Sequence, residues 1–307
     1  MEYHIPSLLE TSVEALEIDP QGTYIDATFG GGGHSWAIFE QLTSGHLIAF
    51  DQDIDSKVNL ERFKDCAGDR SFTFIQANFK YLEKYLKLYG MTGFNGLIAD
   101  LGVSFHQFDN GDRGFSTRFE GNLDMRMNQR AGKTAEQIIR DYQEDELIHI
   151  LSAFGEVKNA RTLAKEIILK RQQEEIKSTY DLKKIALKCA PKGREFKYLA
   201  KLFQALRIEV NDELIALKSL LDQSRSLLMT DGRLAFISYH SLEDRLVKKF
   251  FSSGNFEGEL QKDFYGNIIR PLEPINRKPI VPSDVEISSN PRSRSAKLRI
   301  AKKNNVG

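Results

Sequence analysis

The chain has 307 residues, 41% of them hydrophobic and 28% charged, with 43 basic and 43 acidic side chains in balance. This composition is typical of a soluble globular protein, and the length suits one large α/β domain with an insertion, or two domains. No apolar run approaches the roughly 20 residues of a membrane helix, and no secretory signal is visible at the N-terminus. We therefore expect a cytoplasmic protein without a membrane partner. Cys66 and Cys189 form no CxxC pair, which disfavours a disulfide framework or a zinc ribbon.

Short apolar runs alternate with helical patterns through the first hundred residues. The expected elements are a helix near 7–16, strands at 23–29, 46–51, 72–77 and 94–101, and helices at 34–42, 54–63 and 81–89. Strands that alternate with helices in this way form crossover connections and a parallel sheet. The predicted fold class is therefore α/β, with a doubly wound sheet.

This alternation stops after Leu101. A loop rich in Gly, Asp, Asn and Arg leads into about 80 residues with helical periodicity and no convincing strand. We interpret this stretch as an inserted all-helical subdomain, residues 106–205. The flanking parts, residues 1–105 and 206–307, then form one discontinuous α/β domain.

The α/β pattern returns in the last third of the chain. A long helix is expected at 203–228, a strand at 233–239 and a helix at 242–251. Residues 254–290 contain four prolines and little periodicity, so we expect an extended segment over the surface. Residues 295–301 are predicted to add a last strand at the edge of the sheet.

Four consecutive glycines follow the first expected strand, in the stretch DATFGGGGHS (residues 26–35). Glycines at a strand-to-helix turn let the backbone approach a ligand closely, at the place where doubly wound sheets bind nucleotides. The match to the pattern GxGxxG is incomplete, because Gly30 and Gly32 occupy its first two positions but Ser35 stands at the third. The turn alone is a weak signal for a ligand that contains a nucleoside.

The ends of the next strands strengthen this signal. Asp51 ends the second strand, 19 residues after Gly32, where a carboxylate can accept hydrogen bonds from ribose hydroxyls. Phe79 follows the third strand and can pack on an adenine, and Asp100 ends the fourth. A P-loop is disfavoured, because Met127 stands where its first glycine would be required.

Two cofactor classes fit a glycine turn followed by these residues. A dinucleotide needs a pyrophosphate site, beside which the carboxylate of Asp100 would be unfavourable. S-adenosylmethionine has no phosphate, and its sulfonium gains from a nearby carboxylate. The missing third glycine and the acid at the fourth strand therefore favour S-adenosylmethionine.

The whole chain resembles the bacterial 16S rRNA (cytosine-N4)-methyltransferase family, RsmH (MraW). The matching blocks are YHIPSLLE (3–10), DATFGGGGHS (26–35), DLGVSFHQ (100–107), RGFS (113–116), LDMRM (123–127), FQALRIEVNDEL (203–214), GRLAFISYHSLEDR (232–245) and NPRSRSAKLR (290–299). The resemblance implies a class I (Rossmann-like) S-adenosylmethionine-dependent methyltransferase with a helical insertion. It also implies methylation of the exocyclic N4 of a cytidine in the decoding centre of 16S ribosomal RNA.

The resemblance also assigns site residues. It places seven residues at the cofactor: Gly32, Gly33, His34, Asp51, Phe79, Asp100 and Gln107. The family commonly reads DLGVSSPQ, so Phe105 and His106 depart from its pattern in this loop. Asp100 is the candidate catalytic residue, as an acceptor for an amine proton, although its carboxylate could instead serve only the cofactor. The chemistry needs no metal.

The C-terminal region carries a local excess of positive charge. Nine Lys and Arg residues stand against three acids between Arg270 and Gly307. This is a weak signal for nucleic acid, and four side chains are candidates for phosphate contacts: Arg292, Arg294, Lys297 and Arg299. The expected partner is small-subunit ribosomal RNA, assembled or nearly assembled into the subunit, held over the cofactor in part by the helical insertion. The sequence does not decide between a monomer and a homodimer.

Several alternatives remain at the level of sequence. His240 could be a satisfied buried histidine, and Glu243 and Asp244 could simply favour the start of a helix. The basic helices of the insertion could be a solvated face. Besides an RNA methyltransferase, the chain could be a nicotinamide-dependent oxidoreductase or a non-catalytic RNA-binding assembly factor.

Overall fold

The computed structural model describes residues 6–64, 68–266 and 268–304, which form two compact units. Both ends of the chain build the first unit, residues 1–102 and 214–307, and residues 103–213 build the second. Cys66 lies outside the described residues, and Cys189 is a free thiol. Within the described ranges, no helix combines the length and the apolar character needed to cross a bilayer.

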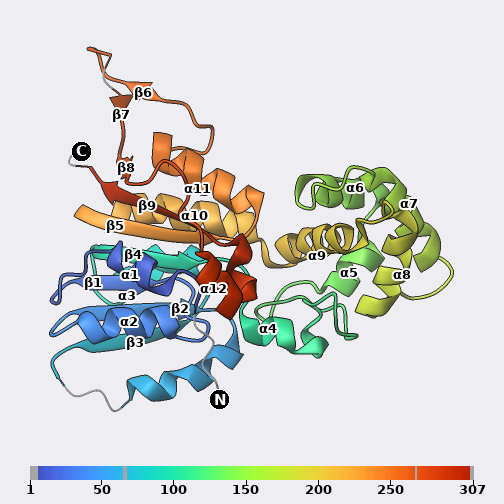
Figure 1. The fold of residues 1–307 in the computed structure, drawn as a ribbon, viewed down its shortest axis with the longest axis horizontal. Coiled ribbons are helices and arrows are strands. Elements are labelled where there is room, and N and C mark those ends of the chain that lie inside the picture. Colours follow the sequence, from blue (N-terminus) through green and yellow to red (C-terminus); the bar gives the residue numbers. More distant parts are fainter. Residues whose placement is uncertain (1–5, 65–67, 267, 305–307) are drawn as a thin grey trace. The chain divides into compact units, whose positions relative to one another are not determined.

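A seven-stranded sheet forms the centre of the first unit (Figure 1). Its strands are β1 (Thr23–Asp26), β2 (His46–Asp51), β3 (Ser71–Gln76), β4 (Phe94–Asp100), β5 (Leu228–Ser238), β8 (Leu272–Pro274) and β9 (Lys297–Lys303). The order is β3-β2-β1-β4-β5-β9-β8, with β1 to β5 parallel and β9 and β8 antiparallel. The predicted α/β class is confirmed, and the sheet is Rossmann-like.

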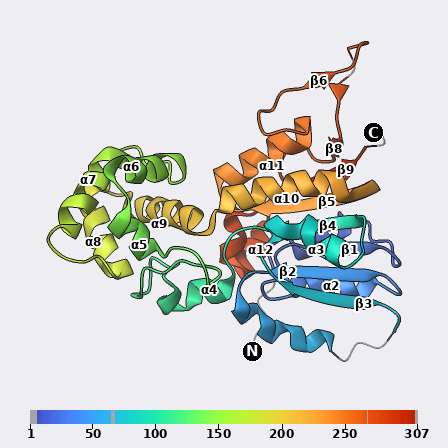
Figure 2. The same ribbon diagram turned by 180° about the vertical axis from the view of Figure 1, so that it is seen from behind.

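Helices cover both faces of this sheet, which Figure 2 shows from behind. They are α1 (Leu9–Glu14), α2 (Gly33–Gln41), α3 (Leu82–Leu88), α10 (Glu213–Leu227), α11 (Ser241–Ser253) and α12 (Asp284–Ser289), with 3-10 segments η1 (Ile54–Phe63), η2 (Phe79–Tyr81) and η4 (Pro291–Ser295). Neighbouring strand residues point to opposite faces, so Tyr24 belongs to the core beneath α1 and α2, and Ile25 to the core beneath α3 and α10. Burial on both faces explains the nearly continuous apolar strands.

The second unit is helical and has its own hydrophobic core. Its elements are α4 (Phe105–Asp109), η3 (Gly111–Arg113), α5 (Ala135–Asp141), α6 (Glu144–Ala153), α7 (Ala160–Arg171), α8 (Thr179–Cys189) and α9 (Glu195–Asn211). Arg113 is 2% exposed, and its Nη2 donates to the carbonyls of Arg126 at 3.0 Å and Met127 at 3.2 Å. This buried arginine therefore holds the LDMRM segment in place.

The single long helix expected at 203–228 is wrong. The structure has two helices, α9 and α10, separated by Asp212, whose φ of 50° lies in the left-handed region. A residue in that conformation ends the helix, and Asp tolerates it better than most side chains do. The break coincides with the passage from the second unit back to the first.

The C-terminal expectations also need correction. β9 is not the edge of the sheet, because it lies between β5 and β8. The segment 254–290 is not simply extended: it contains an antiparallel hairpin of β6 (Gln261–Lys262) and β7 (Ile268–Ile269), followed by β8 and α12. The helix expected at 54–63 is the 3-10 segment η1. Each of these elements depends on pairing with or packing against distant parts of the chain, which periodicity does not report.

Candidate active site

Three aspartates stand at the carboxyl ends of neighbouring strands in the first unit. Asp26 ends β1, Asp51 ends β2 and Asp100 ends β4. β1 and β4 are adjacent in the sheet although two strands separate them in the chain, so the order of strands reverses between them. Open α/β sheets bind ligands beyond the strand ends at such a reversal point.

The glycine turn after β1 is held from both sides. Asp51 Oδ2 accepts a hydrogen bond from the Gly30 amide at 2.8 Å, and Asn59 Nδ2 donates to the Gly30 carbonyl at 2.9 Å. Gly30 and Gly32 have positive φ values of 49° and 73°, which side chains rarely adopt. The turn therefore needs glycine for its shape, and Asp51 connects it to the end of β2.

The glycines differ in the space around them. A Cβ on Gly32 would lie 3.0 Å from the Phe29 ring, and one on Gly33 would lie 2.3 Å from Pro6 Cγ. A Cβ on Gly31 would meet no atom within 4 Å. Side chains at Gly32 and Gly33 would thus meet other parts of the protein, whereas Gly31 faces open space. The cofactor role of Gly32 and Gly33 stays a prediction.

Asp26 is a strand-end carboxylate that the sequence reasoning did not include among the candidate site residues. It is 1% exposed, and it accepts hydrogen bonds from the Thr28 amide at 2.9 Å and from Ser35 Oγ at 2.6 Å. Burial raises the pKa of its carboxyl group, and these hydrogen bonds oppose the shift. The sequence signal that could have identified Asp26 is its position at the end of an apolar strand, shortly before the glycine turn.

Asp51 and Asp100 both have raised pKa values. Burial raises the pKa of Asp51 to about 7, against hydrogen bonds from the Asp53 and Gly30 amides. Burial likewise raises the pKa of Asp100 to about 7, against a hydrogen bond from Tyr239, with Asp26 and Glu243 adding repulsion. Within the described part of the chain, no lysine or arginine forms an ion pair with either group. Their ionisation therefore disfavours the folded protein as the pH rises to 7, unless a donor or cation is bound.

Asp100 is fixed by its neighbours. Its Oδ1 accepts a hydrogen bond from Tyr239 Oη at 2.8 Å, and its backbone amide donates to Thr28 Oγ1 at 2.6 Å. His34 Nδ1 lies 3.9 Å from Asp100 Oδ2, and burial lowers the His34 pKa to about 4, so this pair is not ionic near neutral pH. Tyr239 thus orients the carboxyl group of Asp100 without supplying a positive charge.

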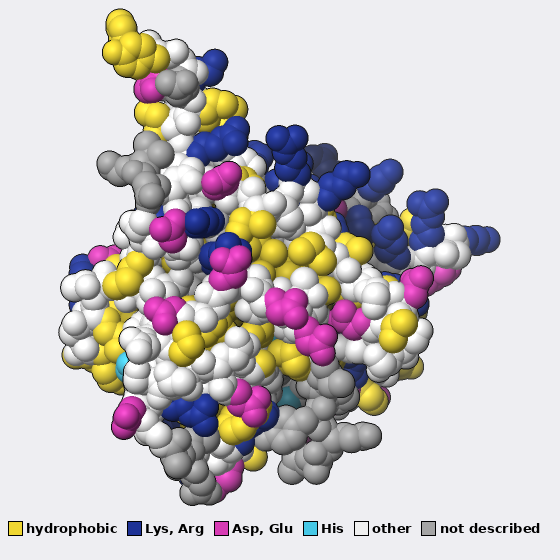
Figure 3. Space-filling view, turned by 60° about the vertical axis from the view of Figure 1, so that its left-hand side comes forward, with side chains coloured by type: hydrophobic (Ala, Val, Ile, Leu, Met, Phe, Trp, Pro, Cys, Tyr) yellow, Lys and Arg dark blue, Asp and Glu magenta, His cyan; other side chains and the backbone are white. Residues whose placement is uncertain are grey.

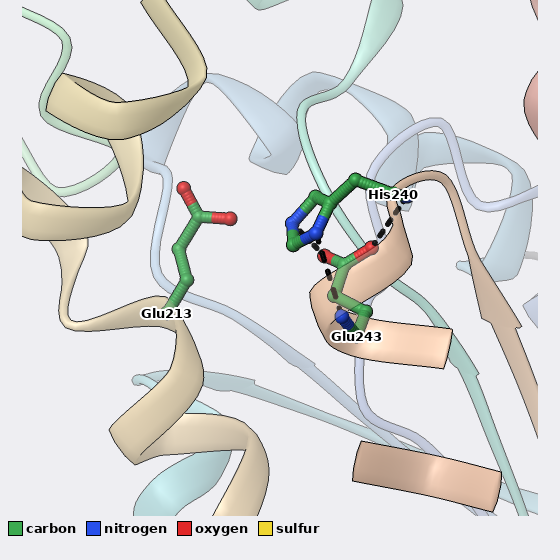
Figure 4. Close-up of side chains that lie close together, drawn as sticks. All are labelled: Glu213, His240 and Glu243. Carbon is green, nitrogen blue, oxygen red and sulfur yellow. Dashed lines mark hydrogen bonds and ion pairs between the residues drawn. The ribbon is translucent and has the colours of Figure 1, made fainter. Parts of the chain in front are cut away.

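His240 begins α11 and forms a capping box with Glu243. His240 Nδ1 accepts a hydrogen bond from the Glu243 amide at 3.4 Å (Figure 4). Glu243 Oε2 accepts a hydrogen bond from the Tyr239 amide at 2.9 Å. His240 Nε2 lies 3.2 Å from Glu243 Oε1. These contacts favour the interpretation of Glu243 as a residue that stabilises the helix start, with His240 as its N-cap. Glu243 also holds the backbone of Tyr239, whose hydroxyl group donates to Asp100.

The remaining predicted cofactor residues lie as follows. Phe79 begins η2 after β3 and is half-buried, packed against the core beneath α3 and α10. The neighbouring Asn78 donates through Nδ2 to Gln52 Oε1 at 2.9 Å, which links this strand end to that of β2. Gln107 belongs to the second unit, where its Oε1 accepts from the Ser104 amide at 3.0 Å in a capping box. The cofactor role of Gln107 stays a prediction.

The predicted phosphate contacts separate into two pairs. Arg292 and Arg294 are exposed on η4. Arg299 is only 6% exposed, and its Nε lies 2.6 Å from Asp244 Oδ1, while Lys297 Nζ lies 3.6 Å from Asp244 Oδ2. Because Asp244 already neutralises Arg299 inside the protein, Arg299 is a poor candidate for the tail contact that the sequence suggested.

The chain is similar to known proteins along its whole length. A sequence profile described as the MraW methylase family matches residues 1–304. A ribosomal RNA small subunit methyltransferase H from Amoebophilus asiaticus is 52% identical over 301 residues, 98% of this chain and 96% of the relative. One of the same name from Cytophaga hutchinsonii is 51% identical, covering 98% of this chain and 99% of the relative.

A solved structure gives a weaker likeness. It is a putative methyltransferase from Streptococcus mutans in complex with SAH, with a TM-score of 0.44 and 13% identity over 98% of this chain and 99% of that one. This likeness supports no separate conclusion. Family membership is shown by the family profile and by the relatives at about half identity, because both span the two units and every strand end described above. The chain therefore belongs to the MraW methylase family.

Proposed function

We propose that this chain transfers the methyl group of S-adenosylmethionine to N4 of a cytidine in the decoding centre of 16S ribosomal RNA, in the cytoplasm. The observation that carries the proposal is the group of strand-end carboxylates around the glycine turn, in a chain of this family. The relatives are named as small-subunit ribosomal RNA methyltransferases, which supports the choice of RNA. The N4 atom comes from the family resemblance.

The residues present suit this cofactor. Gly31 faces open space, so a ligand can lie against the turn. The two carboxylate oxygens of Asp51 accept hydrogen bonds from the Gly30 and Asp53 amides, each at 2.8 Å. Each oxygen retains a lone pair that can accept a hydrogen bond from a ribose hydroxyl. Asp100 has no basic partner in an ion pair among the described residues, so a sulfonium or amino group would complete its environment.

The chemistry is a direct displacement. S-adenosylmethionine supplies an electrophilic methyl group when it is bound. The N4 lone pair forms the new bond to carbon as the carbon–sulfur bond breaks, and one N4 proton must then leave. That amine is a weak nucleophile because its lone pair is delocalised into the ring, so a proton acceptor assists. Asp100 is the acceptor that we assign, held in place by Tyr239.

The target base must leave its helix to reach this site. A stacked or paired cytosine cannot present its amine to a buried methyl donor, so the base is unpaired or extruded. The helical second unit and the exposed Arg292 and Arg294 are the parts of the chain that we assign to holding the surrounding RNA. Recognition of an assembled subunit would then require both units.

Cofactor affinity is expected to rise with pH. Asp100, with a pKa near 7, must be ionised to favour a cation, so protons compete with the cofactor below that pH. Calorimetry at about pH 6 and about pH 8 should show roughly tenfold tighter binding at the higher pH, with release of a proton. Asp100→Asn should weaken this dependence and leave the part that Asp51, whose pKa is also about 7, contributes through the ribose. A flat wild-type profile would exclude Asp100 from contact with the cationic part of the cofactor.

The substrate is tested directly by product analysis. The purified protein is incubated with radiolabelled S-adenosylmethionine and small subunits from cells that lack the enzyme, and the labelled nucleoside is identified by mass spectrometry. N4-methylated cytidine is the expected product. Label on a carbon atom, on uridine or on protein would reject the proposed reaction. Retention of NAD in place of S-adenosylmethionine would support the oxidoreductase, and binding to subunits without transfer would support the assembly factor.

A further inference from the structure

A basic pocket of about 500 Å³ lies in the first unit, bounded by α11 and the segment from β7 to β9. Its lining includes four cationic side chains, one carboxylate and one aromatic ring: Lys248, Arg270, Arg277, Arg299, Glu273 and Phe251. It shares no residue with the strand-end aspartates or the glycine turn. The proposed methyl transfer therefore leaves this pocket without a role.

The backbone of the pocket is held rigidly to the sheet. Asn276 Nδ2 donates to the carbonyls of Lys278 at 2.9 Å and Leu298 at 3.0 Å, and its Oδ1 accepts from the Ile300 amide at 2.8 Å. Arg299 Nη1 lies 3.4 Å from the Arg277 carbonyl, while its Nε binds Asp244. The loop that carries Arg277 is thus fixed to β9 before any ligand arrives.

Asp244 neutralises Arg299, but other cations of the pocket have no such partner in the part of the chain that the structure describes. Lys248 and Arg277 are exposed and take part in no ion pair within the described residues. Arg270 Nε is buried and has no hydrogen-bond partner in the same part of the chain. Glu273 is the single acid of the lining. Guanidinium and ammonium groups gathered in this way favour a phosphate group.

The hairpin β6–β7 leads directly into this pocket, because Arg270 follows β7. Phe264 and Tyr265, at its tip, are 97% and 86% exposed, with their rings 5.6 Å apart and nearly perpendicular at 88°. In Figure 3 the hairpin stands at the top with a yellow tip, and dark-blue side chains lie directly below it. Exposed apolar groups that gather in one place are typical of interaction sites.

We propose that this pocket binds a backbone phosphate of the RNA substrate and that Phe264 and Tyr265 stack on an unpaired base beside it. The proposal rests on the proposed ribosomal RNA function. Cations that follow the backbone, together with aromatic rings that stack on bases, are the means by which proteins hold single-stranded RNA. The hairpin region is therefore a second RNA contact, separate from the cofactor site.

The pocket is tested by the double variant Lys248→Gln/Arg277→Gln. Its matched control is Lys84→Gln/Lys87→Gln on α3, which removes the same charge from exposed positions outside the pocket. Binding to small subunits from cells that lack the enzyme is measured at several salt concentrations. The pocket variant should bind about tenfold more weakly, with a salt slope shallower by roughly 1 to 2 than that of the control.

The tip is tested by Phe264→Ala/Tyr265→Ala. Both rings are exposed, so the fold should persist, with an unchanged melting temperature. Loss of stacking should weaken subunit binding about tenfold, while the salt slope remains that of the wild type. This difference from the pocket variant separates a stacking contact from a charge contact.

Several outcomes would overturn the inference. If both double variants bind subunits as the α3 control does, neither part contacts RNA. Calorimetry with inorganic phosphate tests whether the pocket binds a free phosphate ion in place of an RNA phosphate. If the pocket variant loses phosphate binding but binds subunits normally, the pocket is a site for a small anion. Failure of the proposed function is distinguishable, because the wild type itself would then not methylate the subunits.

Discussion

Asp100→Asn should lower the rate of methyl transfer by about 100-fold or more, the magnitude typical of a lost proton acceptor. The side chain keeps its shape, and Asn can still accept a hydrogen bond from Tyr239, so the fold and the position of the group are preserved. What disappears is the negative charge. Single-turnover rates at saturating cofactor and subunits measure the chemical step, and calorimetry measures cofactor affinity separately.

Tyr239→Phe is the matched control for this variant. It removes the donor that orients Asp100 Oδ1 and leaves the carboxylate in place. A positioning residue should cost less than the acceptor itself, so we expect a decrease of about tenfold at most. Because the Tyr239 hydrogen bond lowers the pKa of Asp100, the pH dependence of the rate should also move to higher pH. A normal rate in Asp100→Asn would exclude it from the proton transfer, and an unchanged affinity as well would exclude it from the site.

Gly31→Val should abolish measurable cofactor binding in a protein that remains folded. A Cβ at this position meets nothing within 4 Å, and its φ is not in the left-handed region, so the side chain is accommodated without strain. It would occupy the open space beside the turn, where the cofactor is proposed to lie. Calorimetry with S-adenosylmethionine measures the loss, and thermal unfolding checks the fold. Wild-type affinity in this variant would displace the cofactor from the turn.

Gly32→Val should behave differently from Gly31→Val. The structure indicates that this change would disturb the fold itself. Gly32 has a φ of 73°, and its Cβ would lie 3.0 Å from the Phe29 ring. A β-branched residue in the left-handed region is strained by roughly 1 to 3 kcal/mol, so Gly32→Val should lose stability as well as binding. A melting temperature equal to that of the wild type would contradict this account of the turn.

The sequence by itself determined the parts of the protein that depend on local pattern. Alternating apolar runs and helical periodicity predicted the five parallel strands near their observed positions, because a strand buried on both faces is continuously apolar. The sequence also made the glycine turn, Asp51 and Asp100 candidates for the site, because the turn follows one predicted strand and the two aspartates stand at the ends of others. Family membership was readable from blocks that span the chain, and the relatives confirm it.

Tertiary structure decided what depends on residues far apart in the chain. The strand order that brings β1 beside β4, and with it Asp26 near Asp100, follows from the crossover of the chain and not from any local pattern. The raised pKa of Asp100 comes from burial among distant neighbours, and the pairing of Arg299 with Asp244 joins positions 55 residues apart. The sequence does not indicate whether a charged side chain is exposed to solvent or forms a buried ion pair. For that reason only the structure showed that Arg299 of the basic tail pairs with Asp244 and is a poor candidate for a phosphate contact. The pocket that contains Lys248 and Arg277 likewise forms only in the folded chain.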